Sequence, residues 1–369
     1  MTAMATSDLR FQGIADELQR ALIQALDEEV ETVPLTYSDL RLIADLSELS
    51  GDRSAEGQAL VLALLVARDE GSLCIRLENE PVAQRLSALM AEDEARKWAG
   101  RVVAQYASGG SGLLGSPDQT GRPLILYQEG RRAYVYFQSY YRAALRLREL
   151  VQERLKANNP EEKAWERVVT EVLCEKPQRL PNGDPLELNE DQLAAVKAGL
   201  TGYFVVISGG PGTGKTSTIT ALLRCLVRGG IRADEISLCA PSGRAAQRMT
   251  EALHAGLDSL EDPSDADKGL RELSGSTIHR LLGYNPRTGR FWRGPDDPVE
   301  ARVIVVDEVS MVDTELMCSL LDAALPDAKI LLLGDKDQLP SVESGAVLAD
   351  LIPEDESNSS VVLLKRNPV

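Results

Sequence analysis

Aromatic residues, histidine and cysteine are all scarce in this chain. Of its 369 residues, 4% are aromatic, two are histidines and five are cysteines. The cysteines form no C-x-x-C pairs, which argues against a zinc site or a disulfide framework, so we expect thiols that are mostly buried. Apolar runs long enough to cross a bilayer are also missing, as is the charged-then-apolar pattern of a secretion signal. These absences favour a soluble, cytoplasmic protein with no membrane partner.

The chain also lacks an excess of positive charge. Its 57 acidic residues outnumber its 40 basic residues, which gives a formal net charge of −17. Proteins that bind nucleic acid usually present a basic face, so this balance weakens the case for a protein that binds DNA by itself. Net charge is a sum over the whole chain, however, and a narrow groove for one strand needs only a local basic lining. DNA binding within a larger complex stays open.

The first half of the chain has mainly the helical spacing of apolar residues. A short strand is expected at 73–77, and two apolar runs at 123–127 and 133–137 flank a polar turn, which predicts a β-hairpin. The predicted helices cover residues 14–26, 58–67, 94–106, 140–155 and 161–173, and two more start at Ser38 and Pro81. We expect a helical N-terminal domain over 1–115 and a hairpin and helical connecting region over 116–186.

The second half, residues 187–369, alternates strands with helices. Buried strands are predicted at 204–208, 237–240, 303–307, 330–334 and 361–364. This alternation is the pattern of an α/β domain with a parallel sheet and helices on both faces. Ligands of such sheets bind at the carboxyl ends of the strands. The functional residues are therefore expected directly after these strands.

The strongest motif follows the strand at 204–208. It has the G-x-x-x-x-G-K-[ST] pattern between a strand and a helix, which predicts a phosphate-binding loop for ATP or GTP. Its glycines let successive N–H groups point at phosphate oxygens near the positive end of the helix. Lys215 is expected to reach the β and γ phosphates, and the Thr216 hydroxyl to hold Mg²⁺. The predicted nucleotide-binding residues here are Gly209, Gly210, Pro211, Gly212, Thr213, Gly214, Lys215, Thr216 and Ser217.

Two further strands lead into polar residues that suit catalysis. Asp307 and Glu308 end the apolar run at 303–306; we expect Asp307 to hold Mg²⁺ through its water shell and Glu308 to polarise the attacking water. Gln338 follows the strand at 330–334, where its amide could bond the γ-phosphate or the water. The alternatives are an ordinary cap for the two acids and a simple turn for the loop that carries Gln338.

Gln192 lies in the first turn of a helix that precedes the phosphate-binding loop, with Asn189 as the expected cap of that helix. The amide of Gln192 has a donor and an acceptor that could bind the edge of adenine. Such a contact would favour ATP over GTP. A solvent-facing glutamine is an equally good interpretation of the sequence.

In this order, the motifs resemble those of superfamily-one helicases, and most closely those of the RecD family, the α chain of exodeoxyribonuclease V in the bacterial RecBCD complex. The matching segments are 188–192, the phosphate-binding loop, 240–246, 277–283, 307–311 and 334–347. The resemblance implies a RecA-like fold for 187–369. It also implies that the N-terminal domain docks RecB- and RecC-like subunits.

The resemblance further implies a motor that uses ATP and Mg²⁺ to move along single-stranded DNA from 5′ to 3′. Such a helicase unwinds double-stranded DNA for the repair of double-strand breaks by recombination. The residues expected to line the DNA are Pro241, Ser242, Gly243, Arg244, Thr277 and His279. Small residues allow close approach to phosphate, and Ser, Thr and Arg supply donors. Taken singly, His279 is more often a core or capping histidine.

The sequence departs from the family at its end. Residues 362–369 fall where the family begins a motif that carries an arginine, and Pro368 and Val369 do not match it. We therefore expect a product truncated before the second motor domain, which would supply an arginine finger; Arg366 is the one candidate substitute. This predicts weak or no hydrolysis by the chain alone. Two alternatives are a stand-alone RecD-like helicase and a nucleotide-gated P-loop subunit without motor activity.

Overall fold

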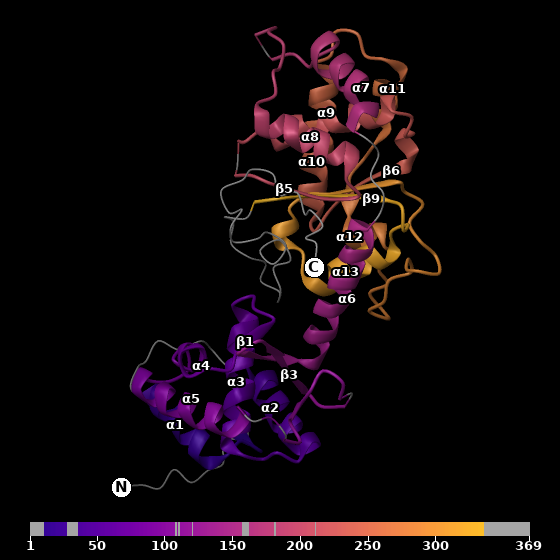
Figure 1. The fold of residues 1–369 in the computed structure, drawn as a ribbon. Helices are drawn as coiled ribbons and strands as arrows, with labels where there is room; N and C mark the ends of the chain where they lie inside the picture. The colour runs from indigo at the N-terminus through magenta and orange to yellow at the C-terminus, as the bar shows by residue number, and fades with distance from the viewer. Residues whose placement is uncertain are drawn as a thin grey trace. The chain divides into compact units, whose positions relative to one another are not determined.

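The computed structural model describes residues 11–27 and 36–335, except 108, 110, 120, 157–161, 181 and 211. The chain divides into two compact units, and in sequence the division falls between Ala144 and Leu145, inside helix α6 (Gln138–Leu155) (Figure 1). This point lies within the region 116–186 that we expected to connect the domains. The predictions that lie outside the described residues are Pro211, Gln338, Arg366 and the strand at 361–364.

In its described part, the first unit contains five whole helices, the N-terminal part of α6 and a four-stranded sheet. The helices are α1 (Asp16–Asp27), α2 (Tyr37–Ser50), α3 (Ala55–Asp69), α4 (Asn79–Leu86) and α5 (Glu92–Tyr106). The strands are β1 (Cys74–Arg76), β2 (Leu114–Gly115), β3 (Leu124–Glu129) and β4 (Arg132–Phe137), in the order β1-β4-β3-β2. β3 and β4 pair antiparallel, so the predicted hairpin is present.

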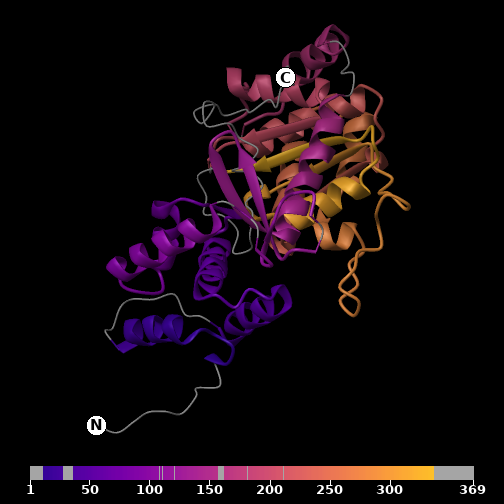
Figure 2. The same cartoon turned by 60° about the horizontal axis from the view of Figure 1, so that its bottom comes forward.

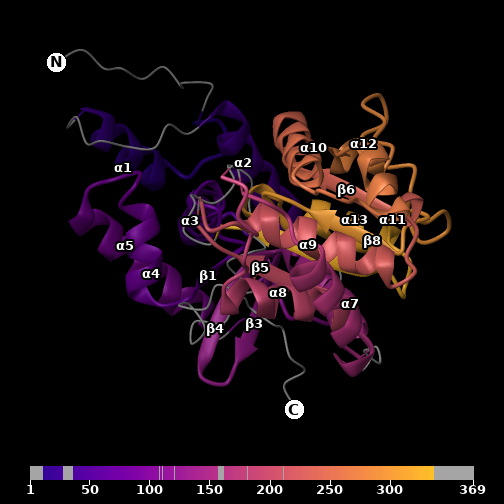
Figure 3. The same ribbon diagram turned by 90° about the horizontal axis from the view of Figure 1, so that it is seen from above.

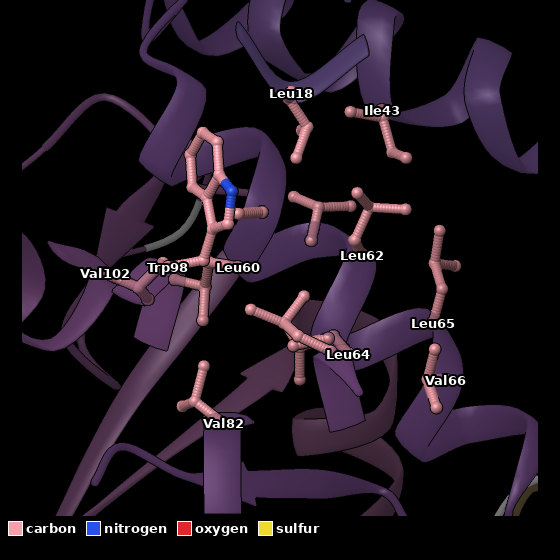
Figure 4. Packing of buried hydrophobic residues seen from close by; sticks show 14 of the residues in the cluster. Leu18, Ile43, Leu60, Leu62, Leu64, Leu65, Val66, Val82, Trp98 and Val102 are labelled. Atoms are coloured by element: carbon pink, nitrogen blue, oxygen red, sulfur yellow. The ribbon is translucent and has the colours of Figure 1, made fainter. Parts of the chain in front are cut away.

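The core of the first unit is built around α3. Ser54 caps this helix by accepting a hydrogen bond from the Gly57 N–H at 3.1 Å. From position 57 to 67 every residue of α3 is buried, because the helix is apolar on all sides rather than on one stripe. Figure 4 shows Leu18 of α1, Ile43 of α2 and Trp98 of α5 gathered around it. The remaining helices are amphipathic and cover α3.

The second unit is an α/β domain, as predicted. Its strands are β5 (Phe204–Ser208), β6 (Ile236–Ala240), β7 (Ser276–Thr277), β8 (Val303–Val306) and β9 (Lys329–Gly334), which pair in parallel in the order β5-β9-β8-β6-β7. Besides the C-terminal part of α6, its helices are α7 (Glu166–Thr170), α8 (Glu190–Thr201), α9 (Lys215–Arg228), α10 (Gly243–Asp258), α11 (Asp265–Gly269), α12 (Ile278–Leu281) and α13 (Thr314–Ala323). A π-helical turn at Glu171–Glu175 and 3-10 turns at Glu162–Ala164, Ala233–Glu235, Leu270–Glu272 and Val309–Met311 complete the described elements.

Helices cover both faces of this sheet (Figure 3). Val205 and Ile207 of β5 pack in one cluster with α8, α9 and α10, whereas Phe204 and Val206 pack in another cluster with α6 and α13. Successive side chains of a strand point to opposite faces, so a continuous apolar run is what a strand buried on both faces requires. The layers leave the carboxyl edge of the sheet for the loops that carry the predicted motifs.

A buried cluster of charged side chains anchors the C-terminal half of α9 to α11. The Asp267 carboxylate accepts hydrogen bonds from Arg224 Nε at 3.0 Å and from Arg228 Nη2 at 2.6 Å. The Ser264 N–H and hydroxyl each donate to the same carboxylate at 2.9 Å. Asp267 and Arg224 are each 1% exposed. Burial alone would raise the pKa of Asp267, but the two guanidinium groups and Ser264 hold the pKa of that carboxyl below its usual range.

A buried lysine, Lys329, joins the start of β9 to the end of α8. The ammonium group of Lys329, on β9, donates to the carbonyl oxygens of Leu200 at 2.9 Å and Gly202 at 2.8 Å. It also lies 4.8 Å from the ring centre of Tyr203. Lys329 therefore satisfies carbonyls that the end of α8 leaves without helical partners. Burial lowers the pKa of this lysine to about 8.

Candidate nucleotide and DNA sites

The phosphate-binding loop joins β5 to α9, as predicted. Gly212 and Gly214 adopt φ angles of 79° and 80°, a left-handed conformation that favours glycine, and Gly214 is the residue before the first turn of α9. The Gly209 N–H donates to the Gly334 carbonyl at 3.1 Å, which ties the start of the loop to the end of β9. The loop therefore leads into a helix N-terminus, where unpaired N–H groups and the helix dipole favour an anion.

One cavity of about 390 Å³ brings four of the predicted catalytic and metal-binding residues together. Lys215 and Thr216 line it from the loop, and Asp307 and Glu308 line it from the end of β8. The Lys215 ammonium group donates to the carbonyl oxygens of the loop itself, at Gly209 and Gly210. A lysine held in this way can transfer its hydrogen bonds to phosphate oxygens by a change of its side chain alone.

The remaining predicted loop residues divide between this cavity and its surroundings. The cavity is also lined by Gly210, Gly212, Thr213 and Gly214. The Gly209 carbonyl accepts a hydrogen bond from the Lys215 ammonium group, and Ser217 lies in the first turn of α9. Neither of these two residues is among those that line the cavity.

Asp307 and Glu308 are positioned by the backbone at the end of β8. The Asp307 N–H donates to the Cys239 carbonyl at 2.9 Å, which extends the pairing with β6 by one residue. The Asp307 carboxylate accepts a hydrogen bond from the Glu308 N–H at 2.9 Å. Glu308 has φ 55° and ψ 43°, and no other non-glycine residue in the described ranges has a positive φ. Backbone strain of this kind is often retained at functional sites.

The electrostatics of this cavity suit a cation. Burial raises the pKa of Asp307, the charge of Glu308 raises it further, and Lys215 acts in the opposite direction. A bound divalent cation would favour the charged form of this carboxyl group and so oppose the shift. Mg²⁺ prefers oxygen ligands and keeps several waters, so the Thr216 hydroxyl and the Asp307 carboxylate, which line the same cavity, fit this ion.

Gln192 lies beside the loop rather than at a distance from it. Its Nε2 donates to the Thr213 carbonyl at 2.9 Å, and its Oε1 accepts from the Asn189 N–H at 3.0 Å, so Asn189 and Gln192 form a capping box at the start of α8. A second cavity of about 180 Å³ is lined by Asp191, Gln192, Thr213 and Lys215. The contact with the loop was not foreseen; binding of adenine by Gln192 stays a prediction.

The two segments predicted to line DNA meet at adjacent strand ends. β6 and β7 pair in parallel with Ala240 opposite Thr277, and one cavity of about 300 Å³ is lined by both Gly243 and Thr277. The Ser242 hydroxyl accepts from the Ala245 N–H at 3.2 Å and caps α10, and the Thr277 hydroxyl caps α12 in the same way. Both hydroxyls thus already serve a helix. Pro241 is half-buried, and Arg244 is exposed.

His279 belongs to an aromatic cluster that the sequence reasoning missed. Its ring centre lies 5.2 Å from that of Tyr284 and 5.6 Å from that of Phe291, and these two rings are 5.4 Å apart. Tyr284 and Phe291 flank the pairing of Asn285 with Arg290, which closes a hairpin. Figure 2 shows this hairpin in orange, extending from the domain. Next to Phe291, Trp292 is 79% exposed. Three aromatic residues within nine positions are unusual in a chain that is 4% aromatic, and this was the available signal.

The sequence of this chain is similar to those of known helicase subunits. A family model described as an AAA domain matches residues 192–344. The RecBCD enzyme subunit RecD of Mycobacterium tuberculosis H37Rv is 32% identical over 361 residues, which cover 95% of this chain and 55% of that protein. The same subunit of Mycolicibacterium smegmatis is 44% identical over 168 residues, which cover 44% of this chain and 30% of that protein. Over most of its length, the chain is therefore similar to RecD subunits.

Other matches cover smaller parts of the chain. The ATP-dependent RecD2 DNA helicase of Deinococcus radiodurans is 40% identical over 165 residues, or 44% of this chain and 20% of that protein. The chain thus spans about half the length of the Mycobacterium tuberculosis relative, and less of the others is matched. Among solved structures, T4 UvsW covers 47% of the chain with a TM-score of 0.33 and 13% identity, which is too low to carry an argument.

No helix in the described ranges is long and apolar enough to cross a membrane.

Proposed function

We propose that residues 187–369 form an ATP-hydrolysing motor domain of a DNA helicase subunit that works in a RecBCD-type exodeoxyribonuclease V. The observation that carries this proposal is the shared cavity of Lys215, Thr216, Asp307 and Glu308 at the carboxyl edge of the sheet. The similarity to RecD subunits supports the assignment to double-strand break repair and the 5′ to 3′ direction of movement. Docking of RecB- and RecC-like subunits by the first unit is part of the same proposal.

In this proposal each residue of the cavity has a separate task. Lys215 moves its hydrogen bonds from Gly209 and Gly210 to the β and γ phosphates. Thr216 and Asp307 would hold Mg²⁺, which would neutralise the phosphate charge. Glu308 accepts a proton from the attacking water, and its left-handed backbone fixes the direction in which its side chain leaves β8. Gln338 retains the proposed contact with the γ-phosphate or the water.

The proposed DNA track lies over the ends of β6 and β7. Gly243, Thr277 and Arg280 line its cavity. Two more exposed arginines, at positions 244 and 248, lie on α10, which follows β6. These arginines supply the local positive charge that a phosphate backbone requires, despite the net charge of −17. The exposed rings of Tyr284 and Trp292 offer surfaces on which bases can stack.

The test is Lys215→Ala, compared with the wild-type chain in binding of Mg·ATP and in ATP hydrolysis with and without single-stranded DNA. We expect binding to weaken about tenfold to hundredfold, because a charged donor to phosphate is lost. Hydrolysis is measured on this chain and on a version extended through a complete second motor domain. Wild-type turnover by the alanine variant of the extended protein would refute the site. Hydrolysis that ignores DNA in both wild-type proteins would favour the nucleotide-gated subunit over the motor.

A further inference from the structure

One face of the sheet in the first unit is rich in tyrosine. Of the nine tyrosines in the chain, five lie in the β3–β4 hairpin and the first turn of α6, at positions 127, 134, 136, 140 and 141. Tyr127 lies opposite Tyr134 in the hairpin, and Tyr136 follows two residues later on β4. Opposite residues, and residues two apart on one strand, share a face of the sheet. We call the face that carries Tyr127, Tyr134 and Tyr136 the tyrosine face.

The tyrosine face is turned away from the core of the first unit. The alternate residues of the hairpin pack in the cluster around α3; they are Leu124, Leu126 and Val135. On the tyrosine face, the ring centre of Tyr141 from α6 lies 5.9 Å from that of Tyr127 and 5.5 Å from that of Tyr136. The three rings of the face are still only half-buried. Aromatic surface therefore stays accessible there.

Arginines lie beside these rings. Arg132 precedes Tyr134 by two residues on β4 and so shares its face, and Arg131 lies in the turn next to it. Both arginines are exposed, and neither forms an ion pair within the described ranges, although Glu129 lies opposite Arg132. On the neighbouring strand, Arg76 lies opposite Tyr134. The tyrosine face therefore carries positive charge that other side chains do not neutralise.

The end of the first unit is basic although the chain is acidic. Residues 122–144 contain four arginines and one acidic residue, whereas the whole chain has a net charge of −17. The two-residue turn of the hairpin holds part of this charge in the open: at Gly130, which has φ 60°, an added Cβ atom would meet nothing within 4 Å. A polyanion can therefore approach this turn without a steric barrier.

Rings and unpaired arginines together suit a single nucleic-acid strand. Unpaired bases stack on aromatic side chains, including those on the face of a sheet, and guanidinium groups neutralise the phosphates. A duplex keeps its bases stacked on one another, so it would use only the arginines.

We propose that the tyrosine face, with Arg131 and Arg132, is a binding site for single-stranded DNA. This site is separate from the proposed DNA track, because it belongs to the first unit and the track lies on the second. The inference goes beyond the proposed function, since it depends on neither the nucleotide cavity nor the ends of β6 and β7.

The experiment locates the bound strand on the full chain. A short oligothymidylate that carries 5-bromouracil is bound and irradiated, which crosslinks it to nearby aromatic side chains. Trypsin cleaves after Arg132 and Arg142 and releases residues 133–142, a peptide with four tyrosines. Mass spectrometry then distinguishes strands bound at the tyrosine face from strands bound at the track. The strand concentration that gives half of the maximal crosslinking to this peptide measures the affinity of the site.

Three variants test the side chains. Tyr134→Leu removes the ring but keeps an apolar residue, Tyr134→Phe keeps the ring, and Arg132→Gln removes one charge. Two controls change the same residue types elsewhere in the first unit: Tyr37→Leu, at a tyrosine that is 60% exposed, and Arg53→Gln, at an exposed arginine.

We expect the wild type to crosslink through residues 133–142. Tyr134→Leu should weaken this site at least about fivefold, the loss of one stacked base, and Tyr134→Phe should behave like the wild type. Arg132→Gln should reduce the slope of log affinity against log salt by about 0.7, as expected for one phosphate contact with a single strand. Both controls should match the wild type.

Four results would overturn the inference. Crosslinks confined to the second unit would remove this site and leave the proposed function intact. Equal competition by a duplex of the same length would exclude stacking, and an equal loss in Tyr134→Phe would exclude the ring as the cause. Loss of assembly with RecB- and RecC-like subunits in Tyr134→Leu, with crosslinking unchanged, would assign the face to protein docking.

Discussion

The buried Asp267 cluster gives the sharpest prediction about stability. Asp267→Asn keeps the shape of the side chain but replaces the carboxylate that faces Arg224 at 3.0 Å and Arg228 at 2.6 Å. The Arg224 side chain, which is 1% exposed, would then lose the carboxylate that it pairs with, and Arg228 would keep only its ion pair with Glu171. Breaking a buried ion pair by removing one partner costs about 3–5 kcal/mol. We expect the free energy of unfolding of the second unit to fall by this amount.

The chain provides a matched control on the same helix. Asp265 pairs with Lys268 at 2.8 Å, but the Asp265 side chain is 98% exposed, so Asp265→Asn should have no measurable effect. Urea unfolding measures both variants, and hydrogen exchange of α9 peptides assigns the change to the helix that Arg224 and Arg228 belong to. Equal stabilities of the two variants, or unchanged exchange of α9, would refute the argument from burial.

The dependence on pH provides an independent check of the same cluster. The folded state holds the pKa of Asp267 below its usual range, so the stabilisation is present above the unfolded pKa of about 3.9 and is lost as pH falls through the folded value. The difference between the wild type and Asp267→Asn should therefore be constant near neutral pH and shrink in acid. A difference that shrinks between pH 6 and pH 8 would contradict this origin.

Two further predictions concern Lys329 and Trp292. The folded state lowers the pKa of Lys329 to about 8, so as pH rises the folded protein loses this proton before the unfolded chain does. Raising the pH from 7 to 10 should therefore stabilise the wild type relative to Lys329→Met by about 2–3 kcal/mol in urea unfolding. Parallel pH curves of the two proteins would contradict this. Trp292→Ala should weaken binding of single-stranded DNA by about 1–3 kcal/mol in fluorescence anisotropy, because a 79% exposed stacking surface is lost. Leu180→Ala, at a 41% exposed leucine, is the control, and equal affinity of the wild type and Trp292→Ala would show that this ring does not contact the DNA.

The sequence was sufficient where a local pattern determines the structure. The strand at 204–208 has the predicted bounds because its four apolar residues are followed by Ser208 and then by the first glycines of the loop, and the φ angles of Gly212 and Gly214 follow from the same motif. β7 was missed because it has two residues, too few for any periodicity. The predicted helix at 161–173 is also interrupted by the π-helical turn at Glu171–Glu175, which has no signature in composition.

Contacts between distant segments were not predictable in the same way. Arg224 and Asp267 are separated by 43 residues, and on a helical pattern a buried arginine is indistinguishable from one on the solvent-facing side of α9. Gln192 was correctly placed in the first turn of a helix next to the nucleotide motif, but its partner Thr213 lies 21 residues away and is a backbone atom, which no residue type marks. Sequence patterns therefore placed the candidate residues on their elements, and packing determined which groups they contact.

The costs to stability in the second unit gather at the same cavity. Glu308 adopts a left-handed backbone conformation. Glycine adopts this conformation readily and asparagine and aspartate do so occasionally, but it is unfavourable for other residues. Asp307 buries a carboxyl group beside a second acid, and this combination raises its pKa. An apolar residue at 307 and a glycine at 308 would continue the strand and the turn with less strain and less buried charge. Groups that destabilise a fold are retained where they serve chemistry, so this departure from the most stable solution is a physical argument, independent of any motif, that the end of β8 is a working part of the site.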